Sequence, residues 1–272
     1  MKRKPRRSLR FETCVLFVCL VAARAIPQPS MIPQAETESA LHGFPAMLDS
    51  QGQKLADGEF RQWVEGGLLH VKIEYIFSNG RRIEEKTSLR PAPQLVQKEW
   101  SWTESKDGEL LRHFQVNFDS GKAVAEKREG NKLKQWNEDI KAEPARTFAG
   151  FAFVLAINRE RSRLINGDKI KLRAVGFTPK PRVVSVEISY GGLDRMSMAN
   201  RVVQGDCFII HPEVSAIAKL FVKTKDTHIW LTTPPAVGFL RWEGPLVEAE
   251  DSVVRVDLVP GEHSGTAEPA HR

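Results

Sequence analysis

Hydrophobic and polar residues alternate with a period of two along most of the middle of this chain, which is the pattern of half-buried β-strands. One face of the clearest stretch carries Leu69, Val71, Ile73, Tyr75 and Phe77. Directly after it comes Asn79-Gly80, the residue pair that type I′ hairpin turns favour. We therefore expect an antiparallel hairpin centred on this turn.

The same alternation recurs on both sides of this hairpin, and turn residues interrupt it about every 10 to 13 residues, as in a meander of antiparallel strands. It predicts further strands at 82–89, 96–102, 110–118, 123–128, 133–138, 169–175, 183–190, 207–210, 219–223, 228–231 and 253–258. The expected fold is mostly β: a strongly curved antiparallel sheet or unclosed barrel of roughly ten to twelve strands.

One segment breaks this rhythm. Residues 148–157 are apolar on every side, and a charged run follows them. Pro144 and Thr147 suit the start of a helix, so we expect a helix at about 147–163, packed on the concave side of the sheet. The apolar run is shorter than the roughly 20 residues that a membrane-spanning helix needs.

The first 25 residues have the three parts of a secretory signal peptide. A basic start leads to an apolar run at 14–22, and Ala23-Arg24-Ala25 fits a cleavage site, with the cut predicted after Ala25. We therefore expect a periplasmic or secreted protein that does not span a membrane after cleavage. The predicted organisation is a signal peptide at 1–25, a flexible leader at 26–45, one β-rich domain at 46–260 and a disordered tail at 261–272.

Removing the signal peptide changes the charge. The whole chain has 40 Lys and Arg against 34 Asp and Glu, and residues 1–25 hold seven of the basic residues and one of the acidic ones, which leaves 33 of each. A neutral chain argues against a nucleic-acid partner, because phosphate neutralisation needs a basic surface. Of the three cysteines only Cys207 remains, in a strand-like run, and we interpret it as a small buried residue rather than a nucleophile or redox thiol.

Catalytic and cofactor motifs are missing from the sequence. The seven histidines form no spacing typical of a metal site, and nucleophile elbows and phosphate-binding glycine loops do not occur. We interpret the acidic pair Glu84-Glu85 as charge on a solvated strand. The sequence predicts a non-enzymatic protein with no cofactor or metal; a hydrolase built from scattered carboxylates and histidines is the weakest of the alternatives.

The tryptophans are the most informative side chains for a binding function. Trp100 and Trp102 are two residues apart and therefore point to one face of a strand. A concave sheet rich in such side chains can enclose an apolar ligand, although large aromatic residues also fill ordinary cores. The candidate ligand-binding wall consists of Trp100, Trp102, Phe114, Phe151 and Trp230.

The second half of the chain has a recognisable order of elements. Two paired strands at 169–175 and 183–190 lead to Gly205-Asp206-Cys207-Phe208, then to His228-Ile229-Trp230-Leu231 and the proline pair Pro234-Pro235. This order resembles uncharacterised exported proteins of bacterial envelopes (DUF3108-like), which are in turn similar to periplasmic lipoprotein carriers and localisation factors. The resemblance covers residues 60–258, and Cys207 departs from it where a threonine or other small residue is usual.

The resemblance implies a curved antiparallel sheet with a helix across its concave side, and no catalytic residues. Together with the sequence pattern, it leads us to expect an envelope protein that binds an apolar or amphiphilic ligand, such as a lipid or a lipoprotein, or a protein of the envelope. The alternative is a protein–protein interaction or assembly module without a ligand cavity.

Overall fold

The computed structural model describes residues 41–198, 201–213, 225–234 and 238–259, which belong to one compact unit spanning residues 34–272. Within it, the strands form a single 15-stranded sheet, and one α-helix packs against it. The sheet curls without closing: β8 and β9 are its two edges. The expected fold class, a mostly β protein with one curved, unclosed sheet, is confirmed.

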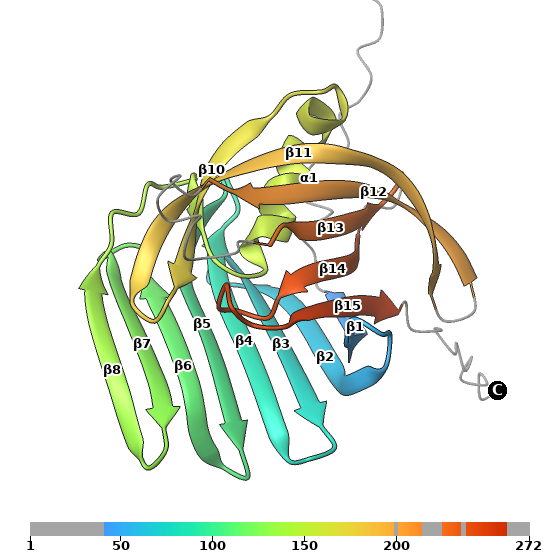
Figure 1. Cartoon of the computed structure of the whole chain (residues 1–272). Coiled ribbons are helices and arrows are strands. Elements are labelled where there is room, and N and C mark those ends of the chain that lie inside the picture. The colour runs from blue at the N-terminus through green and yellow to red at the C-terminus, as the bar shows by residue number, and fades with distance from the viewer. Residues whose placement is uncertain (1–40, 199–200, 214–224, 235–237, 260–272) are drawn as a thin grey trace, which may run out of the picture. The chain divides into compact units, whose positions relative to one another are not determined.

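The first part of the sheet is a meander in which each strand pairs with the next one along the chain (Figure 1). Its strands are β1 (Leu41–Leu48), β2 (Lys54–Glu65), β3 (Leu68–Phe77), β4 (Arg81–Arg90), β5 (Val96–Lys106), β6 (Glu109–Asn117), β7 (Lys122–Glu129) and β8 (Lys132–Asp139). The turn between β3 and β4 lies at the predicted place, but it is not of type I′: Gly80 has a positive φ (81°) and Asn79 does not, and the Gly80 N–H donates to the Phe77 carbonyl oxygen (3.2 Å) across Ser78 and Asn79.

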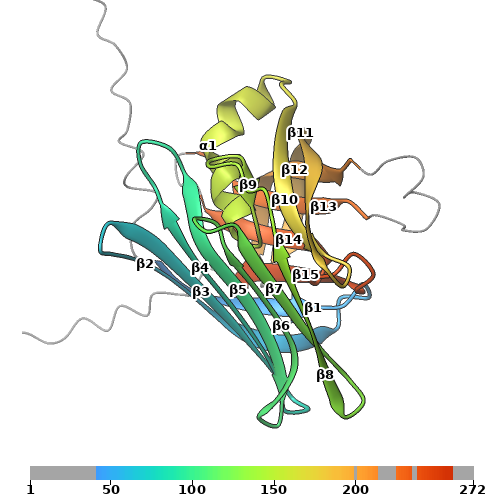
Figure 2. The same ribbon diagram turned by 90° about the vertical axis from the view of Figure 1, so that its left-hand side faces the viewer.

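The second part of the sheet runs back toward the first strand, so that β15 pairs with β1. Its elements are β9 (Thr147–Phe148), α1 (Ala152–Ile165), β10 (Ile170–Phe177), β11 (Pro181–Met198), β12 (Arg201–Pro212), β13 (Thr227–Thr232), β14 (Phe239–Pro245) and β15 (Val253–Val259). Figure 2 shows α1 beside the β9–β12 part of the sheet. All neighbouring strands are antiparallel except β9 and β10.

Curling brings the inward faces of the two parts together in one core. The residues predicted on one face of β3, from Leu69 to Phe77 in alternation, are all buried, and those from Val71 onward belong to this core. Six apolar residues of α1 join the same core: Ala152, Phe153, Val154, Ala156, Ile157 and Leu164. Arg161 fastens the helix to the sheet through its ion pair with Asp206 of β12, which also accepts a hydrogen bond from Tyr190 (3.0 Å).

The start of the helix differs from the prediction. Thr147 does not cap it, because Thr147 and Phe148 form the short strand β9, and the Thr147 hydroxyl accepts a hydrogen bond from the backbone of Glu143 (2.8 Å). The helix begins at Ala152 after Gly150, whose φ of 56° turns the chain out of the strand. The predicted range 147–163 was therefore early at both ends.

The predicted strand number was too low, because β1, β2, β9 and β14 were missed. Asp57 and Gly58 interrupt the apolar pattern of β2, and Gly244 and Pro245 interrupt that of β14. The domain also begins earlier than predicted, since residues 41–45 of the expected leader belong to β1. The signal peptide, the remainder of the leader, the strand at 219–223 and the tail at 261–272 lie outside the residues that the structure describes.

None of the helices that the structure describes has the length and apolar character needed to cross a bilayer.

Candidate functional site

A cavity of about 650 Å³ lies inside the curled sheet, between its two parts. Strands β1 to β5 contribute one wall, β10 to β15 contribute the other, and the start of α1 closes one side. The lining is mostly apolar. Its aromatic side chains are Phe60, Tyr75, Trp100, Trp102, Phe151, Phe153, Phe177, Phe239 and Trp242.

Glu85 of β4 is one of three acidic residues that border the cavity, together with Glu213 and Glu248. It points inward because the inward face of β4 carries Ile83, Glu85, Thr87 and Leu89 in strict alternation. Glu85 lies opposite Ile73 of β3 and Trp102 of β5 in the strand register. Because directly paired residues share a face of the sheet, its carboxyl group lies among inward-facing apolar side chains.

Two N–H groups hold the same oxygen of this carboxyl group. Glu85 Oε1 accepts a hydrogen bond from the indole Nε1 of Trp100 (2.9 Å) and one from the backbone N of Phe151 (2.7 Å). Phe151 is the N-cap residue of α1, so Glu85 satisfies a backbone donor where the helix has no side-chain cap of its own. The helix start and the cavity wall are thereby joined through one carboxyl group.

Gly150 makes this close approach possible. A Cβ at this position would collide with the Glu85 carboxyl group and with the Trp100 indole nitrogen. The φ of 56° is also in the left-handed region that side-chain-bearing residues disfavour. Both the space and the backbone conformation therefore require glycine here.

Gln97 of β5 holds the neighbouring part of the β9–α1 connection. Its amide nitrogen donates to the backbone oxygen of Ala149 (3.0 Å) and to the Thr87 hydroxyl (2.8 Å), and its amide oxygen accepts from the backbone N of Ala149 (2.7 Å). Gln97 is 2% exposed, so these bonds form without competition from water. They fix the backbone that leads into Gly150 and Phe151.

Burial governs the ionisation of the polar groups in the cavity. Desolvation raises the pKa of Glu85, and the hydrogen bonds from Phe151 and Trp100 only partly oppose this effect. Burial also raises the pKa of Tyr75, with a further contribution from the charge of Glu85. Among the residues that the structure describes, no Lys, Arg or His forms an ion pair with Glu85.

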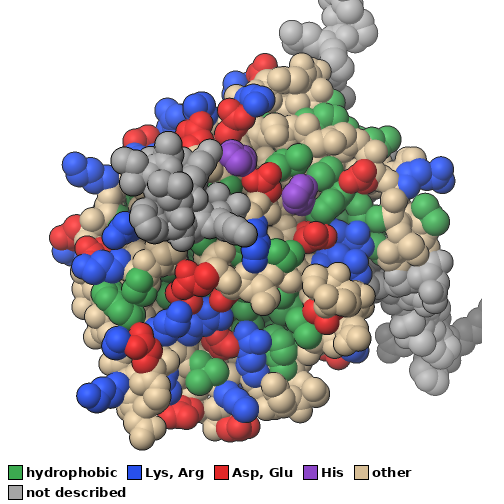
Figure 3. All heavy atoms as spheres, viewed as in Figure 1, with side chains coloured by type: hydrophobic (Ala, Val, Ile, Leu, Met, Phe, Trp, Pro, Cys, Tyr) green, Lys and Arg blue, Asp and Glu red, His purple; other side chains and the backbone are tan. Residues whose placement is uncertain are grey.

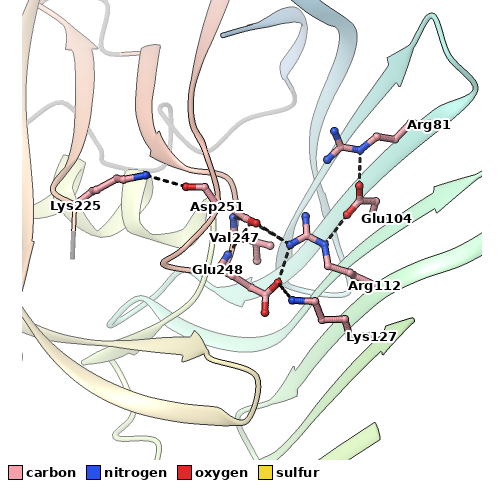
Figure 4. Close-up of polar contacts among 8 residues, drawn as sticks. All are labelled: Arg81, Glu104, Arg112, Lys127, Lys225, Val247, Glu248 and Asp251. Carbon is pink, nitrogen blue, oxygen red and sulfur yellow. Dashed lines mark hydrogen bonds and ion pairs between the residues drawn. The ribbon is translucent and has the colours of Figure 1, made fainter. Parts of the chain in front are cut away.

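The β14–β15 loop (residues 246–252) forms part of the wall, through Leu246 and Val247 among others. Arg112 of β6 holds this loop, because its Nη1 donates to Glu248 (2.8 Å) and to Asp251 (3.0 Å) (Figure 4). Lys127 of β7 also pairs with Glu248 (3.0 Å). The loop is therefore tied by ion pairs to the opposite part of the sheet.

The network continues on both sides of Arg112. Its Nε donates to Glu104 (2.6 Å), which also pairs with Arg81, and its guanidinium lies 5.0 Å from the centre of the Trp102 ring. Asp251 accepts from the backbone N of Val247 and of Glu248 (both 3.0 Å), which fixes the shape of the loop. One side of the cavity wall is thus set by a partly buried ionic network.

The rim of the cavity is charged and polar. Arg182, Glu213 and Lys225 border it and are exposed. Figure 3 shows side chains of both signs spread over this face of the molecule, with hydrophobic side chains between them. The rim therefore carries charges of both signs, whereas the interior is mostly apolar.

The predicted wall residues are distributed unevenly. Trp100, Trp102 and Phe151 border the cavity. Phe114 lies behind the wall, with ring centres 5.7 Å from Trp102 and 4.6 Å from Phe177. Its side chain supports the lining and does not form it.

The prediction for Trp230 was wrong. Ile229 and Leu231 of β13 join the main core, so the intervening Trp230 points to the opposite face of the sheet. There it packs with Cys207 in a second, smaller cluster, and its indole donates to Asp194 (2.8 Å). It does not border the cavity.

The interpretation of Glu84-Glu85 was half wrong. Glu84 lies on the outer face, where it pairs with Lys72 (3.0 Å) and Lys86 (2.5 Å), whereas Glu85 lies in the interior. The alternation of Ile83, Thr87 and Leu89 around Glu85 was the signal that could have placed it inside. It was missed because an acidic pair in a charged run resembles a solvated strand.

Other candidate chemistry does not gather at the cavity. Cys207 is buried outside it, and burial raises the pKa of its thiol to about 12, as expected for a structural cysteine. No group of His, Cys, Asp or Glu that could hold a metal ion occurs among the described residues. Over the same part of the chain, Glu85 has no carboxyl, histidine or cysteine partner within hydrogen-bonding distance.

Comparisons with known proteins leave the chain without a family. No family model matches it, and no curated protein matches it. Among solved structures, it is similar to a β-barrel-like protein of the domain of unknown function DUF1849 from Brucella abortus, at 10% identity and a TM-score of 0.47, over 82% of this chain and 96% of that one. A second similar structure is the hypothetical lipoprotein YmcC from Escherichia coli (K12), at 9% identity and a TM-score of 0.39, over 82% and 88% of the two chains.

At these TM-scores the likenesses carry no argument about function, and neither neighbour is a DUF3108 protein by its description.

Proposed function

We propose that this protein is an exported, non-enzymatic protein of the cell envelope that binds an apolar or amphiphilic ligand in the cavity of its curled sheet. The observation that carries the proposal is the cavity itself: about 650 Å³ of mostly apolar space inside an otherwise well-packed core. Ligand sites are typically concave, about 300–1,000 Å³ in volume and largely apolar, with a few polar groups. Trp100, Trp102 and Phe151 are the proposed wall residues.

The cavity also separates this function from the alternatives. An assembly module without a ligand site has no need for an apolar hollow, since empty space in a core costs stability. A hydrolase needs groups that cooperate across a polar cleft, whereas the carboxyl groups of Glu85 and Glu248 at the cavity are held by separate partners: Glu85 by two N–H donors, and Glu248 by Arg112 and Lys127. The mostly apolar lining therefore favours a protein that binds a lipid, or the acyl part of a lipoprotein, over an assembly module or a hydrolase.

The first experiment is native mass spectrometry of the exported protein, purified from the cell envelope without detergent. We expect a chain that begins at Ile26 and carries an added mass, which organic extraction removes. A chain that retains residues 1–25 would contradict the proposed export signal. A bare chain that also fails to take up the apolar fluorescent probe N-phenyl-1-naphthylamine would contradict ligand binding.

A cavity-filling variant tests where the probe binds. Ala174 of β10 borders the cavity, so Ala174→Phe should occupy part of the space and weaken probe binding by about tenfold or more. Val202→Phe is the matched control, because it adds the same side chain at a position that is 67% exposed. Equal binding by both variants would place the probe elsewhere.

A further inference from the structure

Only one of the two oxygens of the Glu85 carboxyl group accepts hydrogen bonds from the described residues. Oε1 accepts both N–H donors, from Trp100 and from Phe151. No group of the described residues donates to Oε2, and Glu85 borders the cavity. The helix N-terminus, which would repel a cation, is already occupied by Oε1. An acceptor oxygen thus faces the interior without a partner.

Aromatic side chains lie around this carboxyl group. Trp102 lies directly opposite Glu85 on β5, and Tyr75 lies diagonally across on β3. Trp100 and Phe151 flank the carboxyl group through their hydrogen bonds to it, and all four aromatic side chains border the cavity. Proteins bind alkylated ammonium groups at sites lined by aromatic side chains.

From this juxtaposition we infer that the ligand is a cationic amphiphile, whose ammonium end lies against Glu85 inside the cavity while its apolar chain extends along the wall toward the rim. The inference rests on the proposed function and names the ligand class for the same cavity. A carboxylate in an apolar interior without a counter-ion is costly, and a bound cation removes that cost. The hydrocarbon chain supplies the remaining binding energy by burial against the apolar lining.

The same arrangement discriminates against other amphiphiles. A fatty acid would bring a second negative charge to Glu85, which like-charge repulsion disfavours. A fatty alcohol of the same length would gain chain burial but neither the ion pair nor the contact of a cation with the aromatic faces. The binding affinities of three amphiphiles that share one chain length and differ in head group therefore test the inference most directly.

The test uses dodecyltrimethylammonium, dodecanol and dodecanoate, each below its micellar concentration, in competition with N-phenyl-1-naphthylamine on the exported protein after removal of any co-purified ligand. We expect dodecyltrimethylammonium to bind about tenfold or more tightly than dodecanol, as a desolvated cation–π contact and ion pair would give, and dodecanoate to bind most weakly. Glu85→Gln keeps the size of the side chain and should abolish the preference for the ammonium compound, so that this variant binds dodecyltrimethylammonium no more tightly than dodecanol.

Glu84→Gln is the matched control, since it removes a charge from the adjacent residue on the outer face and should leave the ranking intact. Equal or tighter binding of dodecanol or dodecanoate to the unmodified protein overturns the inference and leaves the proposed function standing. Equal weakening of all three compounds by Glu85→Gln also overturns it, because the residue would then only shape the cavity. Failure of every compound and of the probe to bind contradicts the proposed function itself.

Discussion

The indole N–H of Trp100 on β5 donates to the carboxyl group of Glu85 on β4 at 2.9 Å, so this bond joins two strands of the cavity wall. The same carboxyl oxygen accepts from the backbone N–H of Phe151, the N-cap residue of α1. Trp100 and Glu85 also border the cavity. A change at Glu85 should therefore affect stability, helix position and ligand binding together, and suitable pairs of variants separate these effects.

Glu85 should make the protein less stable as the pH rises. Its pKa is raised above the ordinary value of 4.5, chiefly by burial, so its contribution to stability is complete below that value and is lost as the pH rises through the folded-state pKa. We expect the free energy of unfolding of Glu85→Gln, relative to the unmodified protein, to increase from about pH 4.5 toward neutral pH. Urea unfolding at several pH values measures this difference, and two parallel curves would contradict it.

Glu84 should show the opposite sign. Burial opposes ionisation, but the hydrogen bonds from Lys86 and Lys72 prevail and lower its pKa. Its stabilising contribution is therefore present above the unfolded-state pKa and is lost as the pH falls through the folded-state value. In the same urea series, Glu84→Gln should lose its disadvantage relative to the unmodified protein on acidification; an unchanged disadvantage at low pH would refute this.

Gly150→Ala should destabilise the protein by about 2–4 kcal/mol, from backbone strain at positive φ and disruption of two buried hydrogen bonds. The new Cβ would displace the Glu85 carboxyl group from Trp100 and from Phe151. Gly67→Ala is the control, because its φ is also positive (78°) but nothing lies within 4 Å of the added carbon. If thermal or urea unfolding shows equal losses for the two variants, the close contact at Gly150 has no energetic role.

Arg112→Met should cost about 3–5 kcal/mol, the range seen when one partner of a buried ion pair is removed. Glu248 is 1% exposed and would keep only Lys127 as a partner. The β14–β15 loop should loosen, which hydrogen exchange at Val247 and Glu248 would detect. Lys122→Met serves as the control: its ion pair with Asp139 is exposed on both sides and contributes about 0–1 kcal/mol. Equal losses of unfolding free energy in the two variants would show that the ion pairs of Arg112 with the β14–β15 loop do not stabilise the protein.

Cys207 should resist thiol reagents in the folded protein. Burial raises its pKa to about 12, and the side chain packs against Trp230 in the smaller cluster. At pH 8 we expect labelling of the peptide that contains Cys207, followed by mass spectrometry, to require prior unfolding in guanidinium. Complete labelling within minutes under native conditions would show that this part of the sheet opens readily.

Local rules account for the strands that the sequence predicts correctly. In β3 the alternation from Leu69 to Phe77 identifies the buried face, and Gly80 marks the position of the turn because glycine adopts a positive φ at low cost. Where Gly and Pro interrupt the pattern, as in β14, pairing with neighbouring strands maintains a strand that the sequence does not signal. The helix start was misplaced for a similar reason, since its first N–H group is satisfied by Glu85, far away in the sequence.

The sequence by itself determined most strands of the meander, the presence of one internal helix, and the alternation of aromatic residues on β5. The tertiary structure decided which side of each strand faces the cavity. Glu85 turned inward and Trp230 turned outward because the curl of the whole sheet, through pairing of β1 with β15, defines the inside. Alternation separates two faces locally, whereas the choice between them depends on contacts between residues far apart in the chain.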